Sequence, residues 1–303
     1  MKKYPTIILL LVVSVCIMII GCKKREESPS IILGTAISAD GVPIKYEVRG
    51  KGDPALVFVH GWSCDRSYWS AQLPYFARNH QVVAIDLAGH GESGLDRKEW
   101  TMGAFGDDVV AVAVKLKLRR LVLIGHSMGG IVILKAALKM PERVLGLVAV
   151  DEFFNLEKKS TSEEIEKLLA PLRSNFSEVM GNWVRTVFTP KSDPRLIERI
   201  VADMSASPPS VSLGAATGAD GMLEFEFNME NRLIRTLREL KAPIIFINSD
   251  SEPTVVEINK KYLPSFNAKV VPGVGHFVML EVPAIFNSLL EESIRDFKQQ
   301  ATK

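Results

Sequence analysis

Short, largely apolar runs recur along the chain and are separated by segments with helical apolar spacing. Runs of four to seven apolar residues are typical of strands buried on both faces of a sheet. They occupy residues 55–59, 81–85, 121–124, 145–150, 242–247 and 268–271. Helical spacing follows several of them, over residues 69–76, 107–118 and 131–140. Strands that alternate with helices predict an α/β fold, with a mostly parallel sheet covered on both faces.

Two segments depart from this alternation. Residues 31–37 and 42–48 predict a hairpin that turns at Asp40-Gly41. From 152 to about 240 the pattern is only helical, beginning with Ser160-x-x-Glu163, which reads as a capping box. An apolar stripe follows at i, i+3 and i+4 spacing, made of Phe176, Val179, Met180, Trp183, Val184, Val187 and Phe188. We expect part of this stripe to line an apolar acyl pocket; packing against neighbouring helices alone is the alternative.

The first residues indicate an export signal. A basic start precedes an apolar run over residues 7–20, which is shorter than the roughly 20 residues that a membrane span needs. The run ends at Gly21-Cys22, which resembles the lipobox of bacterial lipoproteins. The resemblance implies a signal peptide over 1–21, diacylation of Cys22 and a tether over 22–30. We therefore expect an exported lipoprotein anchored to a membrane of the cell envelope. An uncleaved anchor helix is the alternative, and Lys23 makes outer-membrane sorting the default where such a membrane exists.

The charge of the chain limits its possible binding partners, and its cysteine content limits its possible disulfides. Removing Lys2 and Lys3 with the signal peptide takes the formal charge from +2 to 0, and the sequence contains no basic patch that would indicate a nucleic acid. Of the three cysteines, Cys16 would leave with the signal and Cys22 would carry lipid. Cys64 then has no disulfide partner. The sequence leaves the oligomeric state open.

The strongest chemical signal is Gly125-His126-Ser127-Met128-Gly129, between the apolar run 121–124 and the helical segment 131–140. A serine at such a strand–turn–helix apex has its hydroxyl exposed above the sheet, at the cost of backbone strain. The flanking glycines avoid a collision between strand and helix. Ser127 is therefore the candidate nucleophile.

Four motifs together resemble the alpha/beta-hydrolase family in order and spacing. They are His60-Gly61-Trp62, Asp86 with Gly89-His90-Gly91-Glu92-Ser93, residues 125–130, and Gly273-Val-Gly-His276 with Glu281-Val-Pro283. The resemblance covers residue 31 to the C-terminus. It implies a hydrolase core over 31–151 and 242–303, and a helical cap over 152–241 inserted after the sixth strand. It also implies an oxyanion hole formed by the backbone N–H groups of Trp62 and Met128.

In that family a histidine after the last strand is the base, which corresponds to His276 here. The acid lies just past an earlier strand, where Asp250 and Glu252 compete. Asp250 is nearer the strand end and is our first choice. The family's motif register favours Glu252, and Asp151 is the third candidate.

These residues predict a serine hydrolase that acts on carboxylic esters through acyl transfer to Ser127 and hydrolysis by water. We expect a small apolar ester as substrate, and neither a metal nor an organic cofactor, because no ligand cluster is present. Two alternatives remain. One is another chemistry on the same triad, such as carbon–carbon bond hydrolysis or cofactor-free perhydrolysis, and the other is a ligand-binding receptor with an idle triad.

Overall fold

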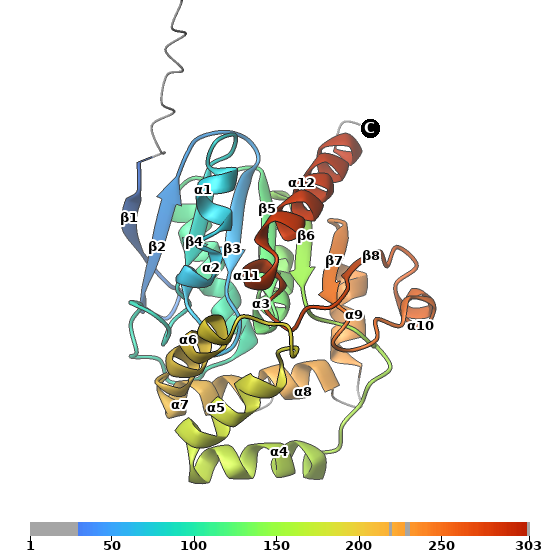
Figure 1. Ribbon diagram of the computed structural model, residues 1–303. Helices are drawn as coiled ribbons and strands as arrows, with labels where there is room; N and C mark the ends of the chain where they lie inside the picture. Colours follow the sequence, from blue (N-terminus) through green and yellow to red (C-terminus); the bar gives the residue numbers. More distant parts are fainter. Residues whose placement is uncertain (1–29, 218–219, 228–230, 302–303) are drawn as a thin grey trace, which may run out of the picture.

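The computed structural model describes residues 30–217, 220–227 and 231–301 (Figure 1). The predicted signal peptide, most of the tether and the lipidation site Cys22 lie outside these residues and stay predictions. In the part that is described, no helix is both long and apolar enough to cross a membrane.

One eight-stranded sheet organises the fold, in the order β1-β2-β4-β3-β5-β6-β7-β8. β1 pairs antiparallel with β2 and β2 antiparallel with β4, and every later neighbouring pair is parallel. This confirms the predicted hairpin and the mostly parallel sheet. The strands are β1 (Ile32–Ile37), β2 (Pro43–Arg49), β3 (Ala55–Val59), β4 (Val82–Ile85), β5 (Leu121–His126), β6 (Val144–Val150), β7 (Ile244–Ser249) and β8 (Ala268–Val271).

Helices cover both faces of the sheet because β3 to β6 are apolar on both faces. α2 (Met102–Lys115) and α3 (Met128–Lys139) pack together on one face. α1 (Gln72–Phe76) and α12 (Pro283–Gln300) lie on the other, as Figure 1 shows. Three short helices complete the core: η1 (Arg66–Trp69), α10 (Val256–Tyr262) and α11 (Val278–Glu281).

The helical cap lies between β6 and β7, after the sixth strand as predicted. It contains α4 (Ser162–Ser174), α5 (Phe176–Thr186), α6 (Pro194–Ser205), α7 (Pro209–Ala216), α8 (Met222–Phe227) and α9 (Arg232–Glu239). The capping box of α4 is one residue later than predicted, because Thr161 and Glu164 repeat the hydroxyl–carboxylate spacing of Ser160 and Glu163. Thr161 and Glu164 make both reciprocal hydrogen bonds.

Two asparagines fix the chain where it leaves β6 for the cap. The Asn248 side chain accepts a hydrogen bond from the N–H of Glu152 at 3.2 Å and donates one to the carbonyl of the same residue. The Asn259 side chain accepts from the N–H of Leu156 at 2.8 Å and donates to the carbonyl of Phe154 at 3.0 Å. These bonds hold residues 152–156 against the core before α4 begins.

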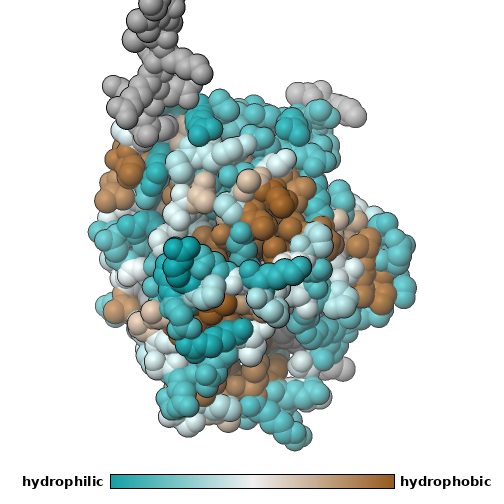
Figure 2. Space-filling view, in the orientation of Figure 1, coloured by the Kyte–Doolittle hydropathy of each residue, from teal (hydrophilic) through white to brown (hydrophobic). Residues whose placement is uncertain are grey.

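Apolar side chains gather on the surface where β1 begins (Figure 2). Ile31, Ile32 and Leu33 are between 55% and 64% exposed. Consecutive strand residues point to opposite faces of the sheet, so the start of β1 is uncovered on both faces. We call these three residues the β1 patch.

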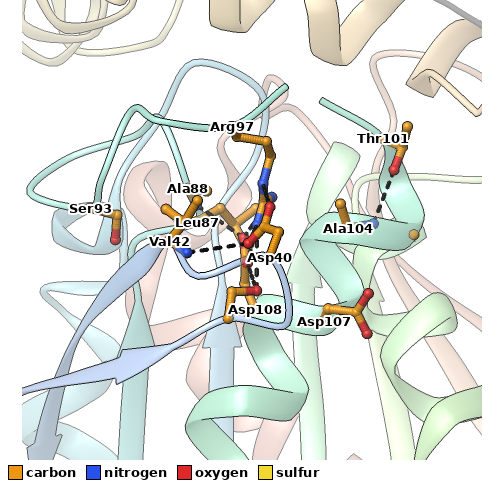
Figure 3. A network of polar contacts seen from close by, with 12 residues as sticks. Asp40, Val42, Leu87, Ala88, Ser93, Arg97, Thr101, Ala104, Asp107 and Asp108 are labelled. Carbon is orange, nitrogen blue, oxygen red and sulfur yellow. Dashed lines mark hydrogen bonds and ion pairs between the residues drawn. The ribbon is translucent and has the colours of Figure 1, made fainter. Parts of the chain in front are cut away.

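A buried ion pair supports the loop that follows β4 (Figure 3). Arg97 donates two hydrogen bonds to Asp108 on α2, at 2.5 and 3.1 Å, and a third to Asp40 in the β1–β2 turn at 2.7 Å. Asp108 also accepts from Ser38 at 2.6 Å and from the N–H of Ala88 at 3.0 Å. Because the four hydrogen bonds to Asp108 and the one to Asp40 converge here, the loop, the hairpin and α2 are fastened at one point.

Asp86 fastens the other end of this loop, where it leaves β4. Asp86 accepts hydrogen bonds from the backbone N–H groups of Arg66 at 2.8 Å and Glu92 at 2.9 Å. Its carboxylate also pairs with the Arg66 guanidinium. Asp86 therefore ties the loop after β4 to the start of η1, close to the residues that follow β3.

Candidate active site

Ser127 occupies the strand–turn–helix apex that the sequence predicts. β5 ends at His126, α3 begins at Met128, and Ser127 between them has φ 51° and ψ −125°. A non-glycine residue at positive φ is strained, and such strain is concentrated at functional sites. The N–H of Ser127 donates to the carbonyl of Val150 at 2.9 Å, which fixes the turn to the end of β6.

The glycines on either side leave no room for a side chain. A Cβ at Gly125 would lie 2.1 Å from the carbonyl oxygen of Gly129. A Cβ at Gly129 would lie 2.6 Å from the carbonyl oxygens of both Val59 and His60. Strand β5, helix α3 and the end of β3 therefore approach one another at a distance that only glycine permits.

His276 contacts Asp151 and no other described carboxylate. Its Nδ1 lies 2.6 Å from Oδ2 of Asp151, and since a carboxylate can only accept, Nδ1 carries the proton. The second oxygen of Asp151 accepts from the N–H of Ser249 at 2.5 Å. Asp151 is fully buried and has φ 53°, another strained position, directly after β6. When the ring is neutral, a proton on Nδ1 leaves the lone pair of His276 on Nε2.

The structure brings neither the first-choice acid, Asp250, nor Glu252 to His276. Asp250 accepts a hydrogen bond from the N–H of Gly273 at 2.8 Å, and so braces the loop before His276 from outside. Glu252 is exposed and pairs with Lys158 at 3.3 Å. Both residues follow β7, whereas β6 lies between β5 and β7. The carboxylate that leaves β6 is therefore nearer the Ser127 turn, and it is the one that reaches His276.

His126 packs against His276 and donates a hydrogen bond to it, a contact that the sequence does not indicate. Its ring lies 4.6 Å from the ring of His276, centroid to centroid, and its Nε2 donates to the carbonyl of His276 at 2.9 Å. Burial, followed by the neighbouring His276, lowers the pKa of His126 well below its usual value. A neutral His126 adds no positive charge beside His276. The two residues are 150 positions apart, so no local pattern could have predicted the contact.

His60 orients the peptide group that bears the first predicted oxyanion donor. Its Nε2 accepts from the N–H of Leu87 at 3.0 Å, so Nδ1 carries the proton and donates to the carbonyl of Gly61 at 2.8 Å. That carbonyl belongs to the same planar trans peptide as the N–H of Trp62, which therefore points the opposite way. The N–H of Met128 is the first of α3, where no acceptor exists within the helix.

The Trp62 side chain has a separate task. Its indole N–H donates to the carbonyl of Ser212 in α7 at 2.8 Å, and its ring meets that of Trp183 in α5 edge-on at 5.9 Å. The hydroxyls of Ser63 and Ser212 lie 2.7 Å apart beside it. The segment after β3 thus attaches the cap to the core.

Ser127 and His276 open into one apolar cavity of about 160 Å³ beneath the cap. Val179, Met180 and Trp183 of the predicted stripe line it. The other members do not: Phe176 and Val184 are buried elsewhere, and Phe188 stacks on Phe277 at 5.4 Å. The sequence pattern missed further lining residues from α4 and α8, namely Leu168, Leu169, Leu172, Met222 and Leu223.

Cys64 also lines this cavity and is a free thiol whose pKa is raised by burial. A thiol in that state packs as a small apolar side chain. No group of three or more histidine, cysteine or carboxylate side chains within the described ranges is arranged to hold a metal ion.

Comparison with known proteins agrees with this geometry. Residues 56–289 match the model of the alpha/beta hydrolase family. A Bacillus subtilis (strain 168) protein provisionally named 2-succinyl-6-hydroxy-2,4-cyclohexadiene-1-carboxylate synthase is 27% identical over 84% of this chain and 95% of its own. The 3-oxoadipate enol-lactonase 2 of Acinetobacter baylyi is 21% identical over 86% of this chain and 96% of its own. The solved structure titled "Est816 as an N-Acyl homoserine lactone degrading enzyme" superposes with a TM-score of 0.74 at 26% identity, covering 85% of this chain and 99% of that one.

Proposed function

From the premise that this chain belongs to the alpha/beta hydrolase family, we propose that it is a serine hydrolase of carboxylic esters, with Ser127 as nucleophile, His276 as base and Asp151 as acid. One observation carries the proposal. His276, held at 2.6 Å by the buried Asp151, lines the same apolar cavity as the strained Ser127.

The proposed reaction begins at the Ser127 hydroxyl, which is a poor nucleophile until a base removes its proton. Nε2 of His276 takes that proton as Oγ bonds to the ester carbonyl carbon. Asp151 holds the ring in the required tautomer and stabilises the imidazolium. The developing oxyanion faces the N–H groups of Trp62 and Met128, and each such donor contributes around 3 kcal/mol in the transition state.

The intermediate then collapses and the alcohol leaves with the proton from His276. A water molecule, deprotonated by the same nitrogen, attacks the acyl group on Ser127. The second intermediate releases the carboxylic acid and returns the proton to Oγ.

The similar proteins support an ester-type bond. One relative is named as an enol-lactonase and one solved structure as a lactone-degrading enzyme, and a lactone is a cyclic ester. The cavity is lined mainly by aliphatic and aromatic side chains, which favours a neutral, apolar acyl group over a charged one. We further propose that the mature protein is held at a membrane through Cys22.

Labelling with a fluorophosphonate, followed by peptide mass analysis, tests the nucleophile. We expect the label on Ser127, loss of labelling and of ester hydrolysis in Ser127→Ala, and no change in the exposed cap control Ser210→Ala. A folded wild type that takes no label overturns the assignment of Ser127 as nucleophile and favours the receptor alternative. Labelling without hydrolysis of any ester in a panel of acyl lengths points to one of the other triad chemistries.

A further inference from the structure

The β1 patch lies at the point where the chain enters the fold. Ile31, Ile32 and Leu33 are three of the nine large apolar side chains that are strongly exposed in the described residues, and they are consecutive. β1 is also the edge of the sheet, so no neighbouring strand covers it. Scattered single apolar residues are ordinary on a surface, whereas a contiguous apolar group on an edge strand is typical of a surface that binds another molecule or a membrane.

Strand directions place this patch away from the catalytic cavity. β1 is antiparallel to β2, and β2 is antiparallel to β4, so β1 runs in the same direction as the parallel strands. Ile32 is in register with Val48, and Val48 with Val83 near the start of β4. The chain therefore enters at the amino-terminal edge of the sheet. Ser127 follows the last residue of β5, at the carboxyl-terminal edge, where the cap lies (Figure 1).

Chain length then limits how the domain can sit on a membrane. Only the eight residues 23–30 separate Cys22 from Ile31, and they span at most about 30 Å when fully extended. A compact domain of roughly 270 residues is about 45–50 Å across. If lipid is attached at Cys22, the tether is too short to lift the β1 edge by the full depth of the domain and bring the cap onto the bilayer.

We propose that the β1 patch lies against the lipid surface, with the catalytic cavity facing away from it, so that the substrate is an ester dissolved in water and not one embedded in the bilayer. This rests on the proposed ester hydrolysis and on the proposed anchor at Cys22. The patch supplies the apolar contact and the short tether keeps it at the surface. The bilayer is what covers the β1 patch, because residues 23–30 between the lipid and the patch span less than the depth of the domain.

Site-specific fluorescence tests the orientation in the full-length lipidated protein. An environment-sensitive NBD label is attached at Leu33→Cys or, as control, at Glu163→Cys on the exposed face of α4; Cys64 is buried and does not compete. In vesicles of phosphatidylethanolamine and phosphatidylglycerol, spin-labelled lipids should quench the label at position 33 and leave that at 163 unchanged. Equal quenching at both positions overturns the proposal. A blue-shifted but unquenched label at 33 would instead assign the patch to a second copy, and overturns it too.

Matched substrates test the consequence for activity. Both carry a butyryl ester: 4-nitrophenyl butyrate in solution, and 1-palmitoyl-2-butanoyl-phosphatidylcholine in the same vesicles. Wild type should hydrolyse the first and spare the second. Inserting about 20 Gly/Ser residues after Glu27 should raise hydrolysis of the vesicle ester by about tenfold and leave the soluble ester unchanged. Equal rates on both esters with the native tether contradict the inference.

Failures of the underlying proposals give different results. If the enzyme assignment is wrong, neither butyryl ester is cleaved, while the quenching pattern still reports the orientation. If the anchor is wrong, Cys22→Ser stays in the membrane fraction as wild type does, or wild type itself is found in the soluble fraction. The orientation is overturned by quenching at α4 whatever the activity results.

Discussion

Nδ1 of His276 lies 2.6 Å from Oδ2 of Asp151, although 125 positions separate the two residues in the chain. The carboxylate comes from the end of β6, the strand beside the one that carries Ser127. It is fully buried and is held in turn by the N–H of Ser249. This arrangement assigns the orientation of the His276 ring to Asp151.

Asp151→Asn should lower the kcat of an activated ester by about 100-fold or more, because the histidine loses the partner that fixes its tautomer; the corresponding change in a serine protease costs on the order of 10⁴. Asp250→Asn and Glu252→Gln are the matched controls and should each cost less than about tenfold, since neither touches His276. Steady-state kinetics on the three purified variants decides. A larger loss of kcat in Asp250→Asn than in Asp151→Asn would make Asp250 the acid that orients His276.

The sequence predicted the fold and the turn at Ser127, but not the contact between His276 and Asp151. Apolar runs and helical spacings are local signals, and they located the strands, the cap and the Ser127 turn correctly. The choice among Asp151, Asp250 and Glu252 depends on which strand lies beside β5 in the sheet, and strand order is not written in local spacing. The same holds for the contact between His126, the last residue of β5, and His276 in the loop after β8.

Narrowing the cavity should change selectivity for acyl length. Val179 lines the cavity from α5, so Val179→Trp fills space beside Ser127. We expect kcat/KM for octanoyl esters to fall by about tenfold or more, with acetyl esters little affected, because each methylene in such a pocket is worth about 1–3 kcal/mol. Ser177→Trp, exposed on the same helix, is the control and should leave both values unchanged. A uniform loss for all chain lengths would mean that Val179 only packs the cap.

Breaking the Arg97–Asp108 pair should destabilise the fold far more than breaking a surface pair. Both of these side chains are almost fully buried, so Arg97→Met strands a carboxylate and should cost about 3–5 kcal/mol. Arg120→Met removes an exposed pair with Asp53 and should cost about 0–1 kcal/mol. Urea unfolding of both variants measures the difference. Similar losses would mean that Asp108 finds other partners when Arg97 is removed.

Acidification should weaken the fold through its buried histidines. Burial lowers the pKa of His60, His126 and His90, the last to about 3. In the unfolded chain these rings take up protons near pH 6.5, while the folded chain keeps them neutral. The stability they contribute is therefore present above about pH 6.5 and is lost as pH falls toward the folded pKa values.

His90→Asn isolates one of these rings, since the Asn amide can replace the hydrogen bond from Nδ1 of His90 to the carbonyl of Ala88. We expect the dependence of the unfolding free energy on pH, between about 5 and 6, to fall by roughly 1.4 kcal/mol per pH unit relative to wild type. Denaturant titrations at a series of pH values measure this slope. An unchanged slope would show that His90 is protonated in the folded protein.

The hydrogen bonds of Asn248 and Asn259 at the base of the cap separate the Asp151–His276 pair from the cap helices that line the cavity. Asn248 and Asn259 hold residues 152–156 on the core, immediately after Asp151. These bonds lie between Asp151 and helices α4 to α8, so we expect a change in the length or packing of those helices to leave the Asp151 carboxylate in place. In evolutionary terms, this attachment would let the cap helices be rebuilt around a different ligand while the contact between Asp151 and His276 is kept.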